Sequence, residues 1–257
     1  DIGSPVFGNL PTDRSPYNAA LFGLVGDGIN VGADSVVVNN GDIYAWGRGI
    51  VSEYNSTTIS NGGYIYTALD NGIHAPGDDN YIMNLGTIDA AIDGIHSGNS
   101  STVINTTTGE IFADRVSLNS VAACGIQVGE ESSVTTDGLI YSAMNNGISV
   151  GYDSVVTATY NSVIGVGNID SEGVGIYSEG RATISNDGFI GGDGSMSLPT
   201  STAPYSSLLL DRAYYGVLVD GAGESLITNE DDGRIYSISH GILAYGDDNV
   251  VVNEGTI

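Results

Sequence analysis

The sequence predicts an all-β fold: a right-handed parallel β-helix (a β-solenoid) of about nine rungs, each of about 22 residues, with several loop insertions. Three observations predict it. One short unit recurs along the chain, apolar residues inside the unit alternate with a period of two, and 38 of the 257 residues are glycine. That glycine share is about twice the usual value of roughly 7%. A period of two indicates strands rather than helices.

The first segment, residues 1–22, does not fit the repeat. Pro5, Pro11 and Pro16 interrupt it, and its apolar residues are scattered. Terminal repeats of a solenoid need a different outer face, so we expect a cap over the first rung. Residues 23–257 then form a single parallel β-helix, since a solenoid has no internal domain boundary.

The repeat unit is clearest in GIHAPGDDNYIMNLGTI, residues 72–88, and GILAYGDDNVVVNEGTI, residues 241–257. Both open on Gly-Ile, pass through Gly-Asp-Asp-Asn and a short apolar strand, and close on Asn-x-Gly-Thr-Ile. A Gly-Ile or Gly-Val pair marks the start of each unit, at Gly28, Gly49, Gly72, Gly94, Gly125, Gly147, Gly175, Gly216 and Gly241. A unit of this length suits one three-sided coil of short strands, and coils stack at about 4.8 Å. The usual hand of parallel crossovers predicts a right-handed coil.

The inward side chains follow from the alternation. In the first three units we expect Val37, Asn39, Ile43 and Ala45, then Ile59, Asn61, Ile65 and Thr67, then Ile82, Asn84, Ile88 and Ala90 to face the interior. The asparagine before each second glycine is expected to stack in a corner ladder, at Asn39, Asn61, Asn84, Asn186 and Asn253. Thr107, Thr136 and Asp231 take its place in other units.

The longest insertion is residues 191–214, and smaller ones are expected at 113–123 and 158–166. Long loops on a regular scaffold are often functional. This one contains side chains that are too apolar for a solvated loop, so they either fold back on the rod or contact another chain. They are Leu208, Leu209, Leu210 and Tyr214, and Tyr215 directly follows the insertion.

Composition restricts the partners. The chain has six Lys and Arg residues against 31 Asp and Glu, a formal charge of −25. Such a charge argues against nucleic acid and against anionic lipid surfaces. The single cysteine, Cys124, excludes an intrachain disulfide. No apolar run is long enough to span a membrane. The first residue is Asp rather than Met, which indicates a mature or excised piece of a longer precursor.

The repeated Gly-Ile, Ser/Thr-Val and Asn-x-Gly-x-Ile pattern over residues 23–257 resembles the β-helical passengers of bacterial autotransporters and related secreted adhesins. The resemblance implies an exported protein at the bacterial cell surface or in the extracellular matrix. It says little about activity, because such repeats occur in proteins of many functions.

An acidic corner after each Gly-Ile strand is the first candidate site. Stacked rungs would bring carboxylates together, and Ca²⁺ takes six to eight oxygen ligands. The candidate ligands are Asp34, Asp78, Asp79, Glu131, Asp153, Asp247 and Asp248. The alternative is a solvated turn in which Asp and Asn are good turn formers.

Two columns of rings are further candidates. One consists of Tyr44, Tyr66, Phe112, Tyr141 and Tyr236, which the alternation points outward. Exposed aromatic rows bind sugars or subunits, whereas cross-rung pairing alone would only stabilise the sheet. The other is His74 and His96, which occupy equivalent positions in adjacent rungs. They are either the start of a metal site or part of a polar ladder with Asn30 and Gln127.

An enzymatic interpretation rests on Gly77-Asp78-Asp79 and His240-Gly241, which resemble pieces of pectinases. In that family the two pieces lie about one rung apart, whereas here most of the chain separates them.

We therefore expect a non-catalytic extracellular structural or adhesive protein that assembles with itself into a filament or surface layer and requires no cofactor. The alternative is a carbohydrate-binding module, assisted or not by Ca²⁺. A polysaccharide hydrolase or lyase is a third possibility. The final Gly255-Thr256-Ile257 stops where the third unit would continue, which leaves an edge for end-to-end or lateral contact with another copy.

Overall fold

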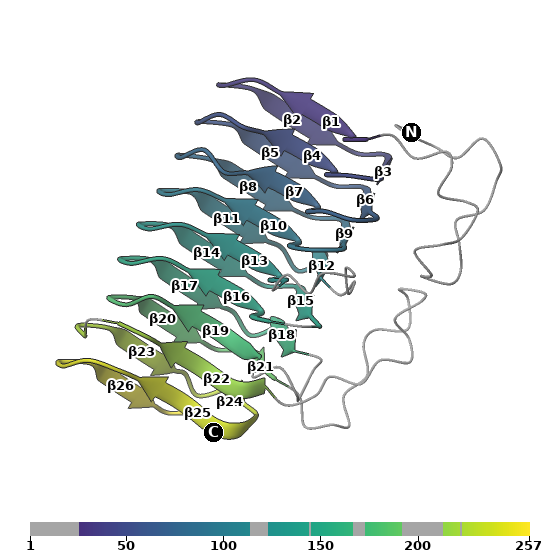
Figure 1. The fold of residues 1–257 in the computed structure, drawn as a ribbon. Helices are drawn as coiled ribbons and strands as arrows, with labels where there is room; N and C mark the ends of the chain where they lie inside the picture. Colours follow the sequence, from purple (N-terminus) through teal and green to yellow (C-terminus); the bar gives the residue numbers. More distant parts are fainter. Residues whose placement is uncertain (1–25, 114–122, 144, 167–172, 192–212, 222) are drawn as a thin grey trace.

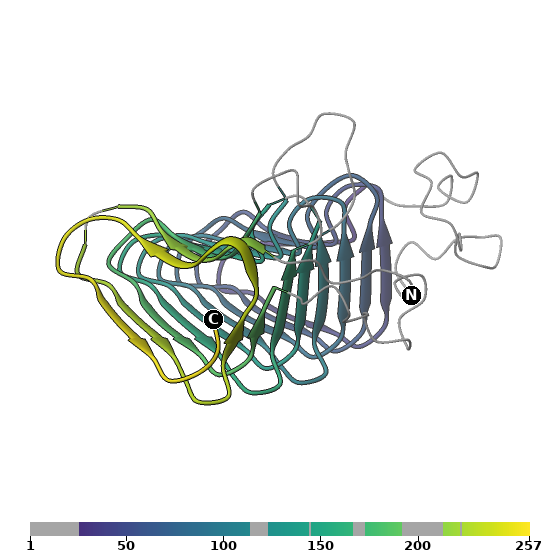
Figure 2. The ribbon, with the colours of Figure 1, turned by 90° about the horizontal axis from the view of Figure 1, so that it is seen from below.

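The computed structural model describes residues 26–113, 123–143, 145–166, 173–191, 213–221 and 223–257. These residues form three parallel β-sheets that stack as successive rungs along one axis (Figure 1). Figure 2 shows the last rung at the near end of the coil with the earlier rungs behind it. The predicted β-solenoid is confirmed, while its right hand stays a prediction. The predicted cap at 1–22 and the side chains of Leu208, Leu209 and Leu210 lie outside the described residues.

Each rung contributes one strand to each sheet, in chain order. The first sheet contains β1 (Ile29–Val31), β4 (Ile50–Ser52), β7 (Ile73–Ala75), β10 (Ile95–Ser97), β13 (Ile126–Val128), β16 (Ile148–Val150), β19 (Val174–Ser178), β22 (Ala213–Val219) and β25 (Ser237–Ala244). The second sheet contains β2 (Val36–Asn39), β5 (Thr58–Asn61), β8 (Tyr81–Asn84), β11 (Thr102–Asn105), β14 (Ser133–Thr136), β17 (Val155–Ala158), β20 (Thr183–Asn186), β23 (Leu226–Asn229) and β26 (Val250–Asn253). The third sheet contains β3 (Asp42–Ala45), β6 (Tyr64–Thr67), β9 (Thr87–Ala90), β12 (Glu110–Ala113), β15 (Leu139–Ser142), β18 (Val163–Val166), β21 (Phe189–Ile190) and β24 (Arg234–Ile235).

Eight rungs are complete and the ninth has two strands. In the ninth rung Thr256 forms an isolated bridge with Arg234 in place of a third strand. The pairing register carries each inward residue directly onto its equivalent in the next rung, as Ile43 pairs with Ile65 and Ile65 with Ile88. One continuous core of Ile, Val and Ala therefore runs along the whole interior. The inward residues predicted for the first three units are all buried.

The glycine of each Gly-Ile pair has a packing function. A Cβ added to Gly94 would overlap the Cγ2 atom of Ile111, from the third sheet of the same rung, and would lie 2.6 Å from the carbonyl oxygen of Gly125 in the next rung. The same isoleucine contact recurs at every glycine of the column, down to Gly241 against Ile257. Gly-Ile recurs because only glycine leaves room for the isoleucine opposite.

The predicted asparagine ladder forms at the corner between the second and third sheets. The Nδ2 group of Asn39 donates to Oδ1 of Asn61 at 2.7 Å, and Asn61 donates to Asn84 at 2.9 Å. The prediction is wrong for Thr107 and Asp231, because the ladder residues of those rungs are Asn105 and Asn229. The turn after Asn105 and the turn after Asn229 each have four residues instead of two. The second glycine of these rungs therefore lies two residues further from the ladder residue than in the other rungs.

The insertions all occur between a third-sheet strand and the next first-sheet strand. The chain is longer than in neighbouring rungs from β12 to β13, from β18 to β19 and from β21 to β22. The insertion expected at 158–166 is wrong, since these residues form the end of β17, a turn and β18. Tyr214 and Tyr215, expected in a loop, belong to strand β22. There Tyr215 stacks on His240 with ring centroids 5.8 Å apart.

Candidate functional site

The outward aromatic column is paired as expected but is not exposed. Tyr44 and Tyr66 pair across adjacent strands with ring centroids 6.3 Å apart, and Phe112 pairs with Tyr141. All four side chains are buried, with Phe112 fully so, and they form two apolar clusters outside the main core. Tyr236 is partly buried. Burial and the neighbouring Asp42 raise the pKa of Tyr44 to about 12. The expectation of an exposed row is therefore wrong for the first four rings, because each ring packs against other residues of its apolar cluster and is buried.

The acidic corner consists of two columns rather than one. In every rung the residue two positions before the second-sheet strand has a positive φ, and none of these residues is glycine. Asp34, Asp79, Glu131, Asp153 and Asp248 occupy this left-handed position. Asp78 and Asp247 each lie one residue earlier. Asp and Asn tolerate the left-handed region better than most residues, which explains the aspartates of this column.

Side chains in the earlier of these columns accept hydrogen bonds from the backbone of the neighbouring rung. Oδ1 of Asn55 accepts the N–H of Asp78 at 3.0 Å, and Oδ1 of Asp78 accepts the N–H of Asn99 at 3.1 Å. Ser56, Ser100 and Arg181 interrupt the left-handed column, and Arg181 pairs with Asp153. Within the described ranges no three His, Cys, Asp or Glu side chains gather as a metal ion requires. The calcium site stays a prediction.

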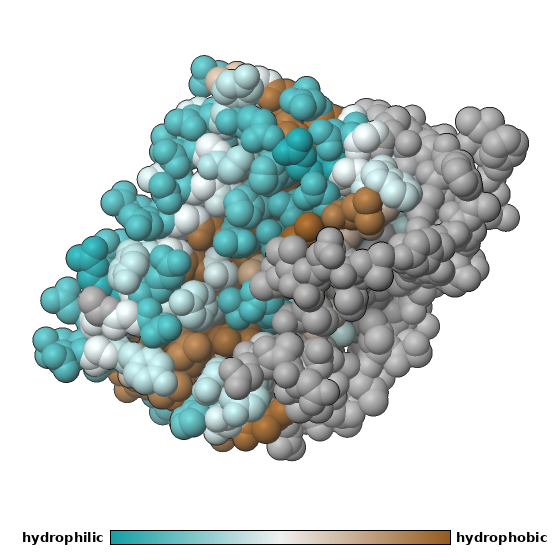
Figure 3. Space-filling view, viewed as in Figure 1, coloured by the Kyte–Doolittle hydropathy of each residue, from teal (hydrophilic) through white to brown (hydrophobic). Residues whose placement is uncertain are grey.

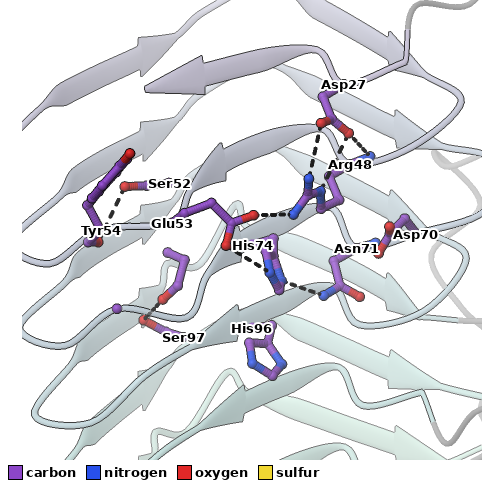
Figure 4. A network of polar contacts seen from close by, with 12 residues as sticks. Asp27, Arg48, Ser52, Glu53, Tyr54, Asp70, Asn71, His74, His96 and Ser97 are labelled. Atoms are coloured by element: carbon purple, nitrogen blue, oxygen red, sulfur yellow. Dashed lines mark hydrogen bonds and ion pairs between the residues drawn. The ribbon is translucent and has the colours of Figure 1, made fainter. Parts of the chain in front are cut away.

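The two histidines lie on the outward face of the first sheet, in the polar network of Figure 4. His74 pairs with His96 in register, and their rings lie 5.2 Å apart at 32°. Val51 separates them from Asn30, and Gln127 follows them. The register thus confirms the predicted ladder except at Val51.

The hydrogen bonds assign opposite tautomers to the stacked rings. Oδ1 of Asn71 accepts the backbone N–H of Asp93, so its Nδ2 group must donate to Nδ1 of His74, at 3.0 Å. Neutral His74 therefore carries its proton on Nε2, which lies 4.0 Å from Oε2 of Glu53. In contrast, Nδ1 of His96 lies 3.3 Å from the buried carboxylate of Asp93 and donates to it. In a neutral ring this places the lone pair of His96 on Nε2.

The network holds His74 neutral. Burial, followed by the neighbouring His96, lowers the pKa of His74 below its ordinary value of 6.5. A proton on Nδ1 of His74 would also face the Nδ2 donor of Asn71. The amide of Asn71 cannot flip to offer its oxygen instead, because that oxygen accepts the backbone N–H of Asp93. Glu53 opposes this shift in the pKa of His74. Its other oxygen pairs with Arg48, which in turn pairs with Asp27.

We expect the free energy of unfolding to fall as the pH drops below about 6.5, because the unfolded chain binds a proton at His74 that the folded chain resists. Urea unfolding at pH 7.5 and pH 5.5 measures this loss. His74→Gln should lose less stability over the interval than the wild type, because glutamine does not titrate. His240→Gln, at an exposed histidine, should behave like the wild type. Equal losses in all three proteins would contradict the lowered pKa of His74.

A shallow groove of about 320 Å³ lies beside His96 on the same face. The outward residues of successive rungs, His96, Gln127 and Ser149, line its floor, and Asn99, Glu130 and Glu179 line its side at the corner toward the second sheet. Its polar groups are mainly hydrogen-bond acceptors. Sequence reasoning missed this groove and the ion pairs of Arg48, because both need the register of several rungs. The one signal in the sequence for the groove is that Gln127 and Ser149 each stand two residues after the glycine of a Gly-Ile pair.

The pieces of an enzymatic site are not brought together. Asp78 and Asp79 lie in the connection from β7 to β8, whereas His240 lies in β25, six rungs away. Cys124 is buried, which raises the pKa of its thiol to about 12, so it is not a reactive nucleophile at neutral pH.

The last rung differs from all others in its exposure. Val251 and Ile257 occupy inward positions but are 48% and 54% exposed, whereas Ile227 and Ile235 of the preceding rung are 1% and 2% exposed. On the face of the first sheet, hydrophilic residues cover most of the described surface; hydrophobic residues gather toward β22 and β25, with smaller hydrophobic patches nearer the first rungs (Figure 3). Leu218 and Leu243 are the outward residues of these two strands, paired in register and partly buried.

Comparisons with known proteins add no identification: no family model, no curated protein and no solved structure matches this chain. In the part of the chain that the structure describes, no helix is long and apolar enough to cross a membrane.

Proposed function

We propose that the chain is a non-catalytic structural or adhesive protein, a rigid rod that assembles with copies of itself into a filament or layer. The supporting observation is the regular stack of parallel rungs, which leaves large apolar side chains such as Tyr54, Tyr160 and Leu226 exposed at its surface, at 56%, 60% and 42%. Burying apolar area contributes about 25 cal/mol per Å². Contact with another copy would cover such side chains and thereby stabilise an assembly.

The rest of the proposal follows the resemblance of the repeats. The rod acts outside the cell, at the bacterial surface, and requires no cofactor. A formal charge of −25 keeps it soluble and repels nucleic acid. The same charge opposes contact between copies, so assembly depends on screening by salt.

Light scattering coupled to size-exclusion chromatography tests the proposal. We expect the mean mass of the 257-residue chain to rise with protein concentration and with sodium chloride from low to moderate ionic strength. Electron microscopy of the heavier fractions should show joined rods. A monomer that responds to neither concentration nor salt would contradict self-assembly.

Carbohydrate binding is the second candidate, and the groove beside His96 favours it. Gln127 and Ser149 offer donors and acceptors in a row at one strand spacing, and Glu130 and Glu179 flank them. We propose that this groove, rather than the buried aromatic column, takes an extended glycan. A glycan array probed with and without Ca²⁺ tests it, followed by the double variant Gln127→Ala, Ser149→Ala. Asn30→Ala, in the same outward column but outside the groove, is the matched control. An array without hits, or binding that the double variant retains, would contradict this assignment.

A further inference from the structure

We infer that the corner ladder contains a binding site for one buried water molecule, where Ala158 and Ser162 replace the asparagine and the glycine of other rungs. The site lies between β14 and β20, in the rung of β17, and the water takes the place of one asparagine amide. Two observations carry this inference: a buried hydroxyl that forms no hydrogen bond within the described residues, and the packing around the neighbouring glycines. It does not depend on self-assembly.

The asparagine ladder has one position without a polar side chain. The last residue of each second-sheet strand forms the ladder, and Ala158 of β17 stands between Thr136 of β14 and Asn186 of β20. Elsewhere the ladder amide donates to the next rung, as Nδ2 of Asn186 does to Oδ1 of Asn229 at 2.8 Å. The methyl group of Ala158 can neither accept from Thr136 nor donate to Asn186.

The same rung departs from the repeat at a second position, Ser162. In seven of the eight third-sheet strands the preceding residue is glycine, whereas Ser162 precedes β18. The turn keeps the form of its four-residue equivalents: the N–H of Ser162 donates to the carbonyl of Thr159 at 2.8 Å, as that of Gly109 does to Thr106 at 2.7 Å. The difference therefore lies in the side chain and not in the backbone.

The exchanges at Ala158 and Ser162 compensate each other in space. A Cβ added to Gly109 would lie 2.2 Å from Oδ1 of Asn105, which is the ladder residue of its own rung. In a four-residue turn, a side chain at this position therefore requires a ladder residue that lacks the amide. Ala158 lacks it, and Ser162 is fully buried in the place that becomes free.

The hydroxyl of Ser162 is the one buried side-chain polar group of the described residues that forms no hydrogen bond. A Cβ added to Gly188 would lie 2.1 Å from this Oγ, so the hydroxyl lies against the corner of the next rung. Asn186 belongs to that corner: its Oδ1 accepts the N–H of Gly188 at 3.3 Å, and its Nδ2 donates to the carbonyl of Gly188 at 3.2 Å. Burying a hydroxyl without a partner is costly, and ordered water commonly supplies the partner.

The atoms and the hydrogen bonds both indicate a single water. Ala158 and Ser162 together have one non-hydrogen side-chain atom fewer than an asparagine and a glycine. Both ladder neighbours present acceptors to the gap, because Oγ1 of Thr136 gives its proton to the carbonyl of Gly138 at 3.3 Å and Oδ1 of Asn186 carries none. A water molecule can donate to both and accept from Ser162, which gives the number of hydrogen bonds typical of a buried water.

A high-resolution crystal structure of the wild-type chain tests the site directly. We expect electron density for a water oxygen within roughly 2.7–3.2 Å of both Oγ of Ser162 and Oδ1 of Asn186. A structure in which Ser162 donates directly to a protein oxygen, with no water beside Ala158, would overturn the inference.

A double variant tests the compensation in solution. Ala158→Asn, Ser162→Gly restores the residues of other rungs, so the amide should replace the water and the urea midpoint should equal or exceed that of the wild type. Each single variant should lower the midpoint by roughly 0.5 M or more. Ala158→Asn alone forces its amide against Ser162, and Ser162→Gly alone enlarges the gap and removes a donor. Tyr160→Asn, at an exposed residue of the same turn, is the matched control and should leave the midpoint nearly unchanged.

The other outcomes contradict the inference. If the losses of the two single variants add up in the double variant, or if the double variant fails to fold, the side chains at 158 and 162 do not share one space. If a crystal structure of the double variant still contains a water between its ladder amide and Asn186, the amide has not replaced the water.

Discussion

Gly94→Ala is expected to lower the free energy of unfolding by about 3 kcal/mol, at the upper end of the usual cost of overpacking a core. The new Cβ would overlap Cγ2 of Ile111 and lie 2.6 Å from the carbonyl oxygen of Gly125. Neither neighbour can move freely, because Ile111 is fully buried and the N–H of Ile95 donates to the Gly125 carbonyl at 3.0 Å. The strain would affect two adjacent rungs at once.

Urea unfolding followed by circular dichroism measures this change. Gly32→Ala is the matched control, because a Cβ there meets no atom within 4 Å and the backbone φ is not positive. We expect the control to stay within about 0.5 kcal/mol of the wild type. Similar unfolding midpoints for Gly94→Ala and Gly32→Ala would show that the glycine column is not required for packing.

Asn84→Ala is expected to cost about 3 kcal/mol, because it breaks the corner ladder in a fully buried position. Asn84 accepts from Asn61 and donates to Asn105, each at 2.9 Å. Its removal leaves the Oδ1 of Asn105 buried without that donor and opens a small cavity. A buried polar group that loses its partner costs roughly 1–3 kcal/mol.

The control for this prediction is Asn40→Ala, at an exposed residue beside the ladder. It should leave the urea midpoint nearly unchanged. Asn84→Asp should destabilise at least as much as alanine at neutral pH, because it sets a carboxylate against Oδ1 of Asn105. If Asn84→Ala unfolds like Asn40→Ala, the ladder contributes no net stability.

Much of the fold could be predicted from local pattern, because one rung is a local structure. The Gly-Ile pair, the inward isoleucines and the corner asparagines lie within about 17 residues of each other and recur, with some substitutions, along the chain. The prediction failed where turn length varies. Thr107 fits the Asn-x-Gly spacing, yet a four-residue turn from Thr106 to Gly109, closed by a 2.7 Å bond between them, assigns the ladder to Asn105.

The candidate sites were predicted less well, because exposure depends on what packs over a column. Alternation correctly directs Tyr44 and Phe112 away from the interior, but it carries no information on their burial in a second layer of contacts. Counting from each glycine likewise placed Asp34 and Asp78 in one acidic column. In the structure Asp34 occupies the left-handed corner position, whereas Asp78 lies one residue before it, which is Asp79 in that rung.

By itself, the sequence determined the rung: which residues turn inward, where glycine must stand opposite isoleucine, and that asparagine stacks at a corner. These depend on interactions that recur every 22 residues or so. Only the tertiary structure decided how rungs are combined. The opposite tautomers of His74 and His96, the groove along Gln127 and Ser149, and the direction of the asparagine ladder from Asn39 to Asn105 each arise from two or more rungs in register. Register is a relation between strands distant in the chain, and no single repeat contains it.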